Sequence, residues 1–239
     1  MIKKIIKKIF NYFNLKIVKI NVHKPIKHPY PVPTKEEIEL IQNSKGILHI
    51  GGHRGTEAAV YDWFNKGVLW IEADPNIFKE LEINIEKHYN QKAICALLGD
   101  VCRTKVPFYI SNNDGACSSV FQFSDEVIKQ KLWSDRNFFT KNIIYLNMMT
   151  LDEIVKKKKI DIKNYDFWIM DIQGAEMLAL KGARESLNFC KSIQIEISQK
   201  NYYQNGAKWL DIKNFLELNK FTLTKEPLYD HTEVLFIKK

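Results

Sequence analysis

Residues 46–55 read GILHIGGHRG, a short apolar run that stops at a glycine turn. The run predicts a buried β-strand over 46–50, and the turn predicts the start of a helix over 55–66. Glycine permits a tight turn and lets a ligand approach the backbone closely. Because ligands of open α/β sheets bind beyond the carboxyl ends of the strands, this turn is the first candidate binding element.

Acidic residues end two further apolar runs. Residues 67–75 read GVLWIEADP and place Glu72 at the end of one run; residues 165–183 read YDFWIMDIQGAEMLALKGA and place Asp171 at the end of another. Apolar runs alternate with helical patterns through most of the chain. The further strands and helices expected on this basis are 68–72, 75–88, 93–98, 166–170, 174–185, 192–197 and 207–219. This order predicts an α/β fold with a parallel, doubly wound sheet.

The middle and the end of the chain depart from this alternation. In the middle, residues 104–148 predict strands over 104–110 and 142–148, a polar loop over 111–119 and a helix over 124–140. The two last strands, expected near 221–225 and 233–238, are joined by a turn short enough for an antiparallel hairpin. We therefore expect one domain over 34–239 with an insertion at about 104–148.

The net charge of +8 resides in residues 1–33, which hold eight lysines and no Asp, Glu or Arg. The remainder is formally neutral, which argues against nucleic-acid binding by the fold. Apolar residues at helical spacing over 2–13, followed by three prolines over 29–33, predict a basic amphipathic arm and a Pro-rich linker. Peripheral contact of residues 1–20 with an anionic membrane is one expectation; docking on the domain or on a second subunit, in a homo-oligomer, is the alternative.

Cysteine spacing and hydropathy indicate the cellular compartment in which we expect the protein. The four cysteines show no C-x-x-C spacing and no zinc-type cluster with histidine, a pattern typical of reduced thiols. No uncharged apolar run approaches the ~18 residues that span a bilayer, and a cleaved signal peptide is not expected. We therefore expect a cytoplasmic protein, held at the inner face of the membrane if the arm binds lipid.

The spacing of Gly51 and Glu72 points to a nucleoside ligand. Glu72 follows Gly51 by 21 positions, close to the separation of about 20 expected for an acid that binds a ribose diol. A dinucleotide fingerprint would require glycine where Ile50 stands, so Gly51, Gly52 and Gly55 favour a single nucleoside over a pyrophosphate. An NAD(P)-dependent oxidoreductase is therefore the less favoured alternative.

Further polar residues stand at the predicted strand ends. Asp100 follows the strand at 93–98 and is a candidate acceptor for an adenine amine, or a residue of a surface turn. Asp171 and Glu196 end neighbouring strands, where two carboxylates can share acid–base work or hold a divalent ion. His53 lies in the glycine turn, within reach of ligand or substrate.

Taken together, these segments resemble the FkbM family of S-adenosylmethionine (SAM)-dependent methyltransferases. The resemblance runs from about Lys45 to the C-terminus and rests on DIQGAEMLALKGA at 171–183, IQIEIS at 193–198, WIEADP at 70–75 and SNND…SS at 111–119. It implies a class I methyltransferase fold: a Rossmann-like, mostly parallel seven-stranded sheet with helices on both faces and a C-terminal antiparallel hairpin. It also implies SAM as the cofactor and O-methylation, often of a sugar or a polyketide hydroxyl.

One position departs from the class I pattern. The residue before Ile50 is commonly acidic in these enzymes and is His49 here, which leaves the ammonium group of the ligand without its usual partner. Glu57, one turn into the next helix, is the candidate substitute. The residues expected to bind the cofactor are Gly51, Gly52, His53, Gly55, Glu57, Glu72, Ala73, Asp100 and Asp171.

The expected reaction assigns roles to three residues. Asp171 is the first candidate base, His53 the second, and Glu196 orients the substrate or shares a metal. The expected substrate is a sugar hydroxyl, nucleotide-linked or in a capsule or lipopolysaccharide. Tyr202, Tyr203 and Trp209 suit sugar stacking or ordinary core packing equally well. A non-catalytic sugar- or membrane-binding module on the same fold is the alternative.

Overall fold

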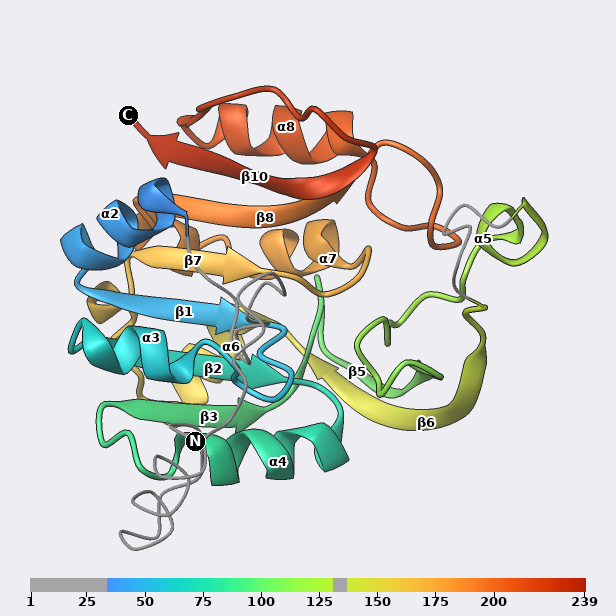
Figure 1. The fold of residues 1–239 in the computed structure, drawn as a ribbon, viewed down its shortest axis with the longest axis horizontal. Coiled ribbons are helices and arrows are strands. Elements are labelled where there is room, and N and C mark those ends of the chain that lie inside the picture. The colour runs from blue at the N-terminus through green and yellow to red at the C-terminus, as the bar shows by residue number, and fades with distance from the viewer. Residues whose placement is uncertain (1–33, 131–136) are drawn as a thin grey trace, which may run out of the picture. The chain divides into compact units, whose positions relative to one another are not determined.

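A seven-stranded sheet is the main feature of the computed structural model, which describes residues 34–130 and 137–239 (Figure 1). The strand order is β3-β2-β1-β7-β8-β10-β9, and β10 runs antiparallel to both of its neighbours while the other pairs are parallel. The strands are β1 (Gly46–Ile50), β2 (Gly67–Glu72), β3 (Gln91–Cys95), β7 (Phe167–Met170), β8 (Ser192–Ser198), β9 (Phe221–Leu223) and β10 (His231–Lys238). The mostly parallel sheet with a C-terminal antiparallel hairpin is therefore confirmed.

Helices cover both faces of this sheet (Figure 1). Successive strand residues point to opposite faces, so Ile47 packs with Tyr61 and Leu81 on one side while Leu48 packs with Leu180 and Leu216 on the other. The first face carries α2 (Lys35–Asn43), α3 (Ala58–Trp63) and α4 (Pro75–Ile85); the second carries α6 (Leu151–Lys158), α7 (Glu176–Lys181) and α8 (Trp209–Leu218). Two 3-10 turns, η1 (Ile162–Asn164) and η2 (Ser186–Phe189), complete the second layer.

Side-chain caps define where several helices begin. Thr34 and Glu37 form a capping box, in which each side chain accepts from the other residue's backbone N–H. Asp74 accepts from the N–H of Asn76 and precedes Pro75, which takes the first position of α4. These local signals fix the first residues of α2 and α4.

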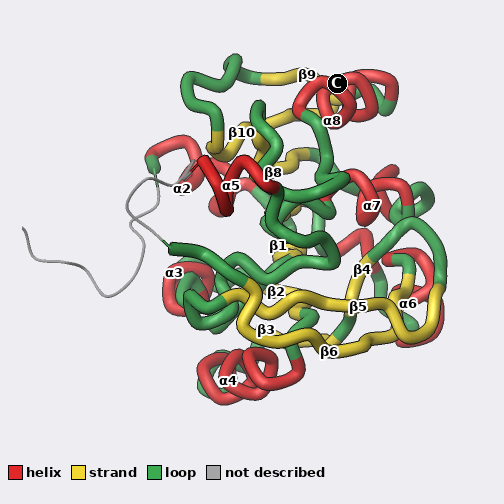
Figure 2. The backbone as a smooth tube through the Cα atoms, turned by 90° about the vertical axis from the view of Figure 1, so that its right-hand side faces the viewer, coloured by secondary structure: helices red, strands yellow, loops and turns green. Residues whose placement is uncertain are grey.

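The region between β3 and β7 forms a second, three-stranded sheet of order β4-β6-β5. Figure 2 shows β5 (Arg103–Ser111) and β6 (Thr140–Met149) running side by side. The two-residue strand β4 (Leu97–Leu98) pairs with β6. The apolar residues of this sheet pack on Ala175, in the turn that follows β7. The second sheet therefore lies against the carboxyl end of a central strand of the main sheet.

Three predicted elements differ in the structure. The strand expected at 93–98 is interrupted: β3 ends at Cys95, and Leu97–Leu98 pairs with β6 because both leucines are buried in the second sheet. The helix expected at 174–185 ends at Lys181, where Gly182 packs directly on the carbonyl of Gly99. The helix expected at 124–140 is α5 (Asp125–Gln130), and β6 already begins at Thr140.

The predicted basic arm at 1–33 lies outside the described residues, so its amphipathic helix, its linker and its membrane contact stay predictions. Across 34–130 and 137–239, none of the helices combines the length and apolar character needed to cross a membrane. All four cysteines are free thiols.

Candidate active site

The glycine turn after β1 lies against two neighbouring strands. The N–H groups of Gly51 and Gly52 both donate to the carbonyl of Ile71 in β2, at 2.9 and 3.0 Å. Gly51 has a φ of 85°, and a Cβ there would lie 1.8 Å from the carbonyl oxygen of Asp171. Glycine is required at this position because the backbone after β7 passes through the space that a side chain would take.

The other two glycines of the turn also pack on protein atoms. A Cβ at Gly52 would lie 2.8 Å from the Trp70 ring, and one at Gly55 would lie 2.6 Å from a methyl group of Leu81. The sequence suggested that these glycines admit a ligand. The structure gives a different reason for them, which is the close packing of the turn on β2 and α4.

Glu72, at the end of β2, is held by two backbone donors. Its Oε2 accepts from the N–H of His53 and its Oε1 from the N–H of Asp74, both at 2.8 Å. The residue is 9% exposed, and burial raises the pKa of the carboxyl although the backbone donors oppose this. Each oxygen keeps capacity for a further hydrogen bond, so the carboxylate is fixed in a pose from which it can accept from a ligand diol.

His53 connects the glycine turn to the polar loop that follows β5. Its Nε2 lies 3.1 Å from the carbonyl oxygen of Asp114 and 3.2 Å from Nη1 of Arg54. The second candidate base is thus in contact with the loop at 111–119. Ala73, between Glu72 and Asp74, is partly buried against the apolar cluster of the second sheet.

His49 faces the helical layer. Its Nδ1 lies 3.1 Å from the hydroxyl of Tyr61 in α3, and its ring stacks on Trp70 at a centroid distance of 4.5 Å. Burial lowers the pKa of His49, and the charge of Glu57 opposes this. Glu57 is partly buried just before α3 and accepts from the hydroxyl of Thr56. The imidazole of His49, which stands where an acidic residue was expected, is therefore packed between β1, β2 and α3.

Asp100 is not brought to the other predicted site residues. It follows β4, and its carboxylate forms an ion pair with Arg103 at 2.8 Å. The preceding Gly99 packs on Gly182 at the C-terminal end of α7, whereas the site residues lie at the end from which α7 starts. The expectation that Asp100 ends the third strand of the main sheet was wrong, because the sheet is interrupted after Cys95.

Asp171 and Glu196 are brought together by a residue that lies between them. The amide Nε2 of Gln173 donates to Oδ1 of Asp171 at 2.5 Å and to Oε2 of Glu196 at 2.8 Å. The same amide accepts, through Oε1, from the hydroxyl of Tyr203 at 2.6 Å. Gln173 has a left-handed φ of 57° and is 7% exposed, so the turn after β7 points its amide inward.

The two carboxyl groups share one environment that favours the protonated form. Burial, followed by the charge of Glu196, raises the pKa of Asp171 well above its usual range. Burial, followed by the charge of Glu176, raises the pKa of Glu196 to about 8. Adjacent buried carboxyl groups titrate as a pair, and one shared proton removes the repulsion between two charges. We call these two residues the carboxyl pair.

Glu176 organises the backbone of the same turn. Its Oε1 accepts from the N–H groups of Ile172 and Gly174, both at 3.1 Å. The side chain is almost fully buried, and burial raises its pKa to about 7. The Tyr203 ring packs on Gly174, where a Cβ would lie 3.0 Å from the ring. The turn is therefore clamped between an acid from α7 and an aromatic ring from the loop after β8.

His231 adds a further contact to the carboxyl pair. Its Nε2 lies 3.0 Å from Oε1 of Glu196, and its Nδ1 lies 2.9 Å from Oγ of Ser198. The structure makes His231 the first residue of β10, opposite Ser198 in the ladder with β8.

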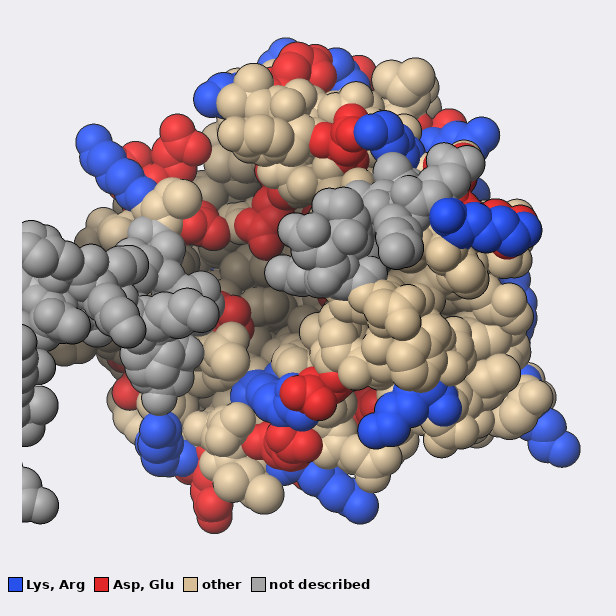
Figure 3. Space-filling model, turned by 45° about the vertical axis from the view of Figure 1, so that its right-hand side comes forward, with Lys and Arg blue, Asp and Glu red and all other residues tan. Residues whose placement is uncertain are grey.

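A cavity of about 660 Å³ opens beside the carboxyl pair. Its wall includes Glu196 and Ser198 from β8, Asn201 and Tyr202 from the following loop, and Trp209 at the start of α8. Figure 3 shows a hollow in the surface of the molecule, with acidic side chains around it. A space of this size is within the range of small-molecule sites.

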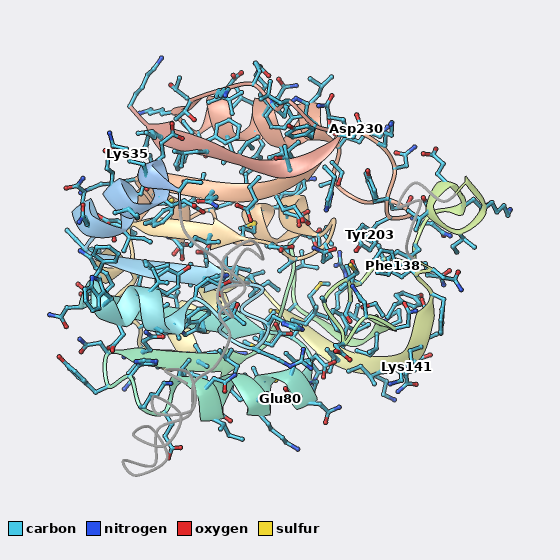
Figure 4. All side chains as sticks on the ribbon, in the orientation of Figure 1. Lys35, Glu80, Phe138, Lys141, Tyr203 and Asp230 are labelled. Carbon is cyan, nitrogen blue, oxygen red and sulfur yellow. The ribbon has the colours of Figure 1, made fainter. Side chains whose placement is uncertain are left out.

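The aromatic residues after β8 form core contacts. Tyr202, Tyr203 and Trp209 are 5%, 5% and 9% exposed. Tyr203 stacks on Phe123 at 5.4 Å, and Phe138 belongs to the same cluster (Figure 4). Core packing, one of the two readings of these residues, therefore accounts for them, although Tyr202 and Trp209 also reach the cavity wall.

The carboxyl pair does not present a metal site. The Nε2 donor of Gln173 lies between the two carboxyl groups, where a bridging cation would sit. Among the residues that the structure describes, no group of three or more His, Cys, Asp or Glu side chains is arranged to hold a metal ion.

Four residues around the carboxyl pair were not among the site residues predicted from the sequence: Gln173, Glu176, Tyr203 and His231. Gln173 and Glu176 lie within the motif DIQGAE, so the motif held the signal, but the direction of the Gln173 amide depends on its left-handed backbone. Tyr203 reaches Gln173 from 30 positions away, and His231 reaches Ser198 from 33 positions away. Local patterns give no indication of such contacts.

Several solved structures are similar to this chain. A magnesium protoporphyrin IX methyltransferase from Synechocystis PCC 6803 with bound SAM is 12% identical; the match covers 85% of this chain and 77% of that chain at a TM-score of 0.41. Fibrillarin from Aeropyrum pernix, with natively bound S-adenosyl-L-methionine, is 11% identical over 82% of this chain and 68% of that chain, at a TM-score of 0.46. A TehB-like SAM-dependent methyltransferase from Corynebacterium glutamicum is 12% identical over 99% and 96%, at a TM-score of 0.44.

No curated protein matches the chain. A family model does, with the description "Methyltransferase FkbM domain", over residues 49–223. The matched range contains the glycine turn, Glu72, Asp171 and Glu196. It also covers well over half of the sequence, and this chain therefore belongs to the FkbM methyltransferase family.

Proposed function

We propose that this protein transfers a methyl group from SAM to a hydroxyl oxygen of a sugar, either nucleotide-linked or part of a capsule or lipopolysaccharide. Family membership supports methyl transfer. The observation that carries the choice of oxygen is the carboxyl pair, in which Gln173 holds Asp171 and Glu196 together at the carboxyl ends of β7 and β8. A hydroxyl is a weak nucleophile at neutral pH, so its methylation calls for a base of this kind.

The glycine turn and Glu72 suit the expected methyl donor. The two carboxylate oxygens of Glu72 are fixed by backbone N–H groups beside the turn, an arrangement that matches a ribose diol. Bound SAM would supply an electrophilic methyl group on a sulfonium. The closest expected contacts are Gly51, Gly52, His53, Gly55, Glu57, Glu72, Ala73 and Asp171.

Asp171 is the base in this proposal. Because burial and Glu196 raise its pKa, an ionised Asp171 binds a proton more strongly than an ordinary carboxylate. Glu196 lines the cavity and shares the Gln173 donor, so it orients the acceptor, and its negative charge makes Asp171 a stronger base. Most of the remaining rate acceleration comes from holding the acceptor oxygen in line with the methyl group.

The cavity supports a polyhydroxylated acceptor. Its wall combines three carboxyl groups, a serine hydroxyl, two side-chain amides and two lysines with Tyr202 and Trp209. Groups of this kind donate to and accept from several hydroxyls at once. The membrane-facing capsule or lipopolysaccharide context rests on the basic arm at 1–33 and remains part of the proposal.

Asp171→Asn tests the base. We expect turnover with SAM and a panel of nucleotide sugars to fall by roughly 100-fold or more, while the affinity for S-adenosylhomocysteine changes little. Asp125→Asn, at an exposed position of α5, is the control and keeps full turnover. Unchanged turnover in Asp171→Asn would reject the assignment of the base.

A ligand screen by thermal unfolding separates the rival functions. A ligand at 100 times its dissociation constant adds about 2.7 kcal/mol to the free energy of unfolding. We expect stabilisation by SAM and S-adenosylhomocysteine. Stabilisation by NAD or NADP alone would favour an oxidoreductase. Stabilisation by sugars with no methyl transfer to any of them would favour a binding module.

A further inference from the structure

His231 lies directly behind the wall of the cavity. It is opposite Ser198 in the β8–β10 ladder, and its two ring nitrogens contact two side chains of β8. Nε2 lies 3.0 Å from Oε1 of Glu196, and Nδ1 lies 2.9 Å from Oγ of Ser198. Both partners line the cavity, while the imidazole packs at 4.9 Å from the ring of Tyr202.

The two oxygens of Glu196 face in different directions. Oε2 accepts from Gln173, the residue that also holds Asp171, and Oε1 faces the imidazole of His231. A continuous series of hydrogen-bonded groups therefore leads from Asp171 to His231. The side chain of Glu196 is 14% exposed and that of His231 is 23% exposed, so the series leads toward solvent.

We propose that His231 is a positioning residue that fixes Glu196 and accepts the proton which the carboxyl pair removes from the acceptor hydroxyl. The inference rests on the proposed O-methyl transfer. In one turnover the O–H bond of the acceptor breaks and an O–CH₃ bond forms. The S–CH₃ bond breaks with its electron pair left on sulfur, and the proton passes to the carboxyl pair.

The proton must then leave the pair before the next turnover. Glu196 gives it from Oε1 to Nε2 of His231, which forms an imidazolium. The imidazolium releases the proton carried by Nδ1, past Oγ of Ser198, to solvent. Exchange with water, by gain of a proton at Nδ1 and loss of the proton on Nε2, restores the starting tautomer, and the balance is one proton released for each methyl group transferred.

The surroundings of His231 favour a neutral ring in the resting state. Burial lowers the pKa of its imidazole, although the charges of Asp171 and Glu176 oppose this. A neutral ring can accept at Nε2 only if its proton is on Nδ1, where Ser198 offers an acceptor. Among the described residues, the titratable and charged groups that face or flank the ring include Glu196 in β8, Asp171 after β7, Glu176 in α7, Tyr202 in the loop after β8, and the ion pair of Lys200 with Asp230.

A histidine that only connects β10 to β8 would carry its ring proton on Nε2 and not on Nδ1. In that case Nε2–H would donate to an ionised Glu196, and the ring would have no lone pair directed at the carboxyl group. The position of the ring proton therefore separates the two roles, and it can be measured without any methyl transfer.

Nitrogen-15 NMR of the full chain, with labelled histidine, provides this measurement at pH 7.5. His231→Gln identifies the signals among those of the six histidines. We expect His231 to be neutral with its proton on Nδ1, and Glu196→Gln to shift both ring signals. A neutral ring with its proton on Nε2, or a ring protonated at both nitrogens, would overturn the proposal.

Kinetics of His231→Gln give the second readout, because glutamine can still donate to Glu196 but cannot take up a proton. We expect kcat to fall at least about 10-fold, with KM for SAM unchanged and the acidic limb of the pH profile altered. Thr222→Val, at an exposed position of β9, is the control. Unchanged kcat would contradict the relay. A wild-type chain that transfers no methyl group would instead reject the proposed function, and the NMR result would stand by itself.

Discussion

The hydroxyl of Tyr203 donates to Oε1 of Gln173 at 2.6 Å, and through this contact the loop after β8 sets the direction of the amide that joins the carboxyl pair. The amide of Gln173 can present its NH₂ group to both acids only if its oxygen points the other way. The same hydroxyl lies 3.2 Å from the carbonyl oxygen of Cys117, in the polar loop after β5. Tyr203 thus links two loops to the position of one side chain.

Tyr203→Phe should therefore disturb the carboxyl pair indirectly, because Tyr203 contacts Gln173 and not the two acids. The buried Oε1 of Gln173 loses its donor, which costs about 1–3 kcal/mol in the free energy of unfolding. We expect kcat to fall more than the affinity for S-adenosylhomocysteine, as measured by steady-state kinetics and calorimetry. Tyr145→Phe, at an exposed position of β6, is the control. A fall in stability with unchanged kcat would show that the hydroxyl serves folding alone.

A pair of glycine variants tests the packing of the turn. Gly51→Ala places a Cβ at 1.8 Å from the carbonyl of Asp171 in a left-handed backbone, so we expect a loss of more than about 2 kcal/mol or failure to fold. At Gly67 the nearest atom to a new Cβ is 3.7 Å away. The free energy of unfolding of Gly67→Ala should therefore lie within about 1 kcal/mol of the wild-type value. Equal stability of the two variants in urea unfolding would contradict this account.

Glu72→Gln tests the candidate ribose contact. An amide can accept through only one of its ends, so the N–H of either His53 or Asp74 loses its acceptor. We expect the dissociation constant of S-adenosylhomocysteine to rise about 10- to 100-fold in isothermal titration calorimetry. Glu82→Gln, on the exposed side of α4, should bind as the wild type does. A lower unfolding temperature with unchanged affinity would leave Glu72 a purely structural role.

The raised pKa of Glu196 predicts how stability depends on pH. A carboxyl group whose pKa is 4.5 when unfolded and about 8 when folded binds a proton more tightly in the folded state. Its contribution is fully present below the unfolded pKa and is lost as pH rises toward about 8. One such group changes the free energy of unfolding by up to about 1.4 kcal/mol per pH unit.

Glu196→Gln should flatten this dependence. We expect wild-type unfolding temperatures to fall between pH 5 and pH 8, and to fall less in the variant, at constant ionic strength. Glu86→Gln, at an exposed position after α4, should follow the wild-type curve. Parallel curves for Glu196→Gln and the wild type would mean that Glu196 is ionised throughout this range.

The alternation of strands and helices and the row of strand-end residues followed from the sequence. Apolar runs with periods of strands and helices are local signals, and the rule that parallel strands end at one edge places Gly51, Glu72 and Asp171 together. The same rule failed for Asp100, because the interruption after Cys95 depends on the second sheet, where Leu97 and Leu98 are buried.

The sequence by itself determined the sheet, its reversed last hairpin and the family, since each rests on patterns a few residues long. Only the tertiary structure decided which groups surround the carboxyl pair. Gln173 turns inward through a left-handed backbone, Tyr203 returns to it across 30 positions, and the β8–β10 register brings His231 to Glu196. The physical reason is that hydrogen bonds between side chains distant in sequence form only after strands have paired, and no local period encodes that pairing.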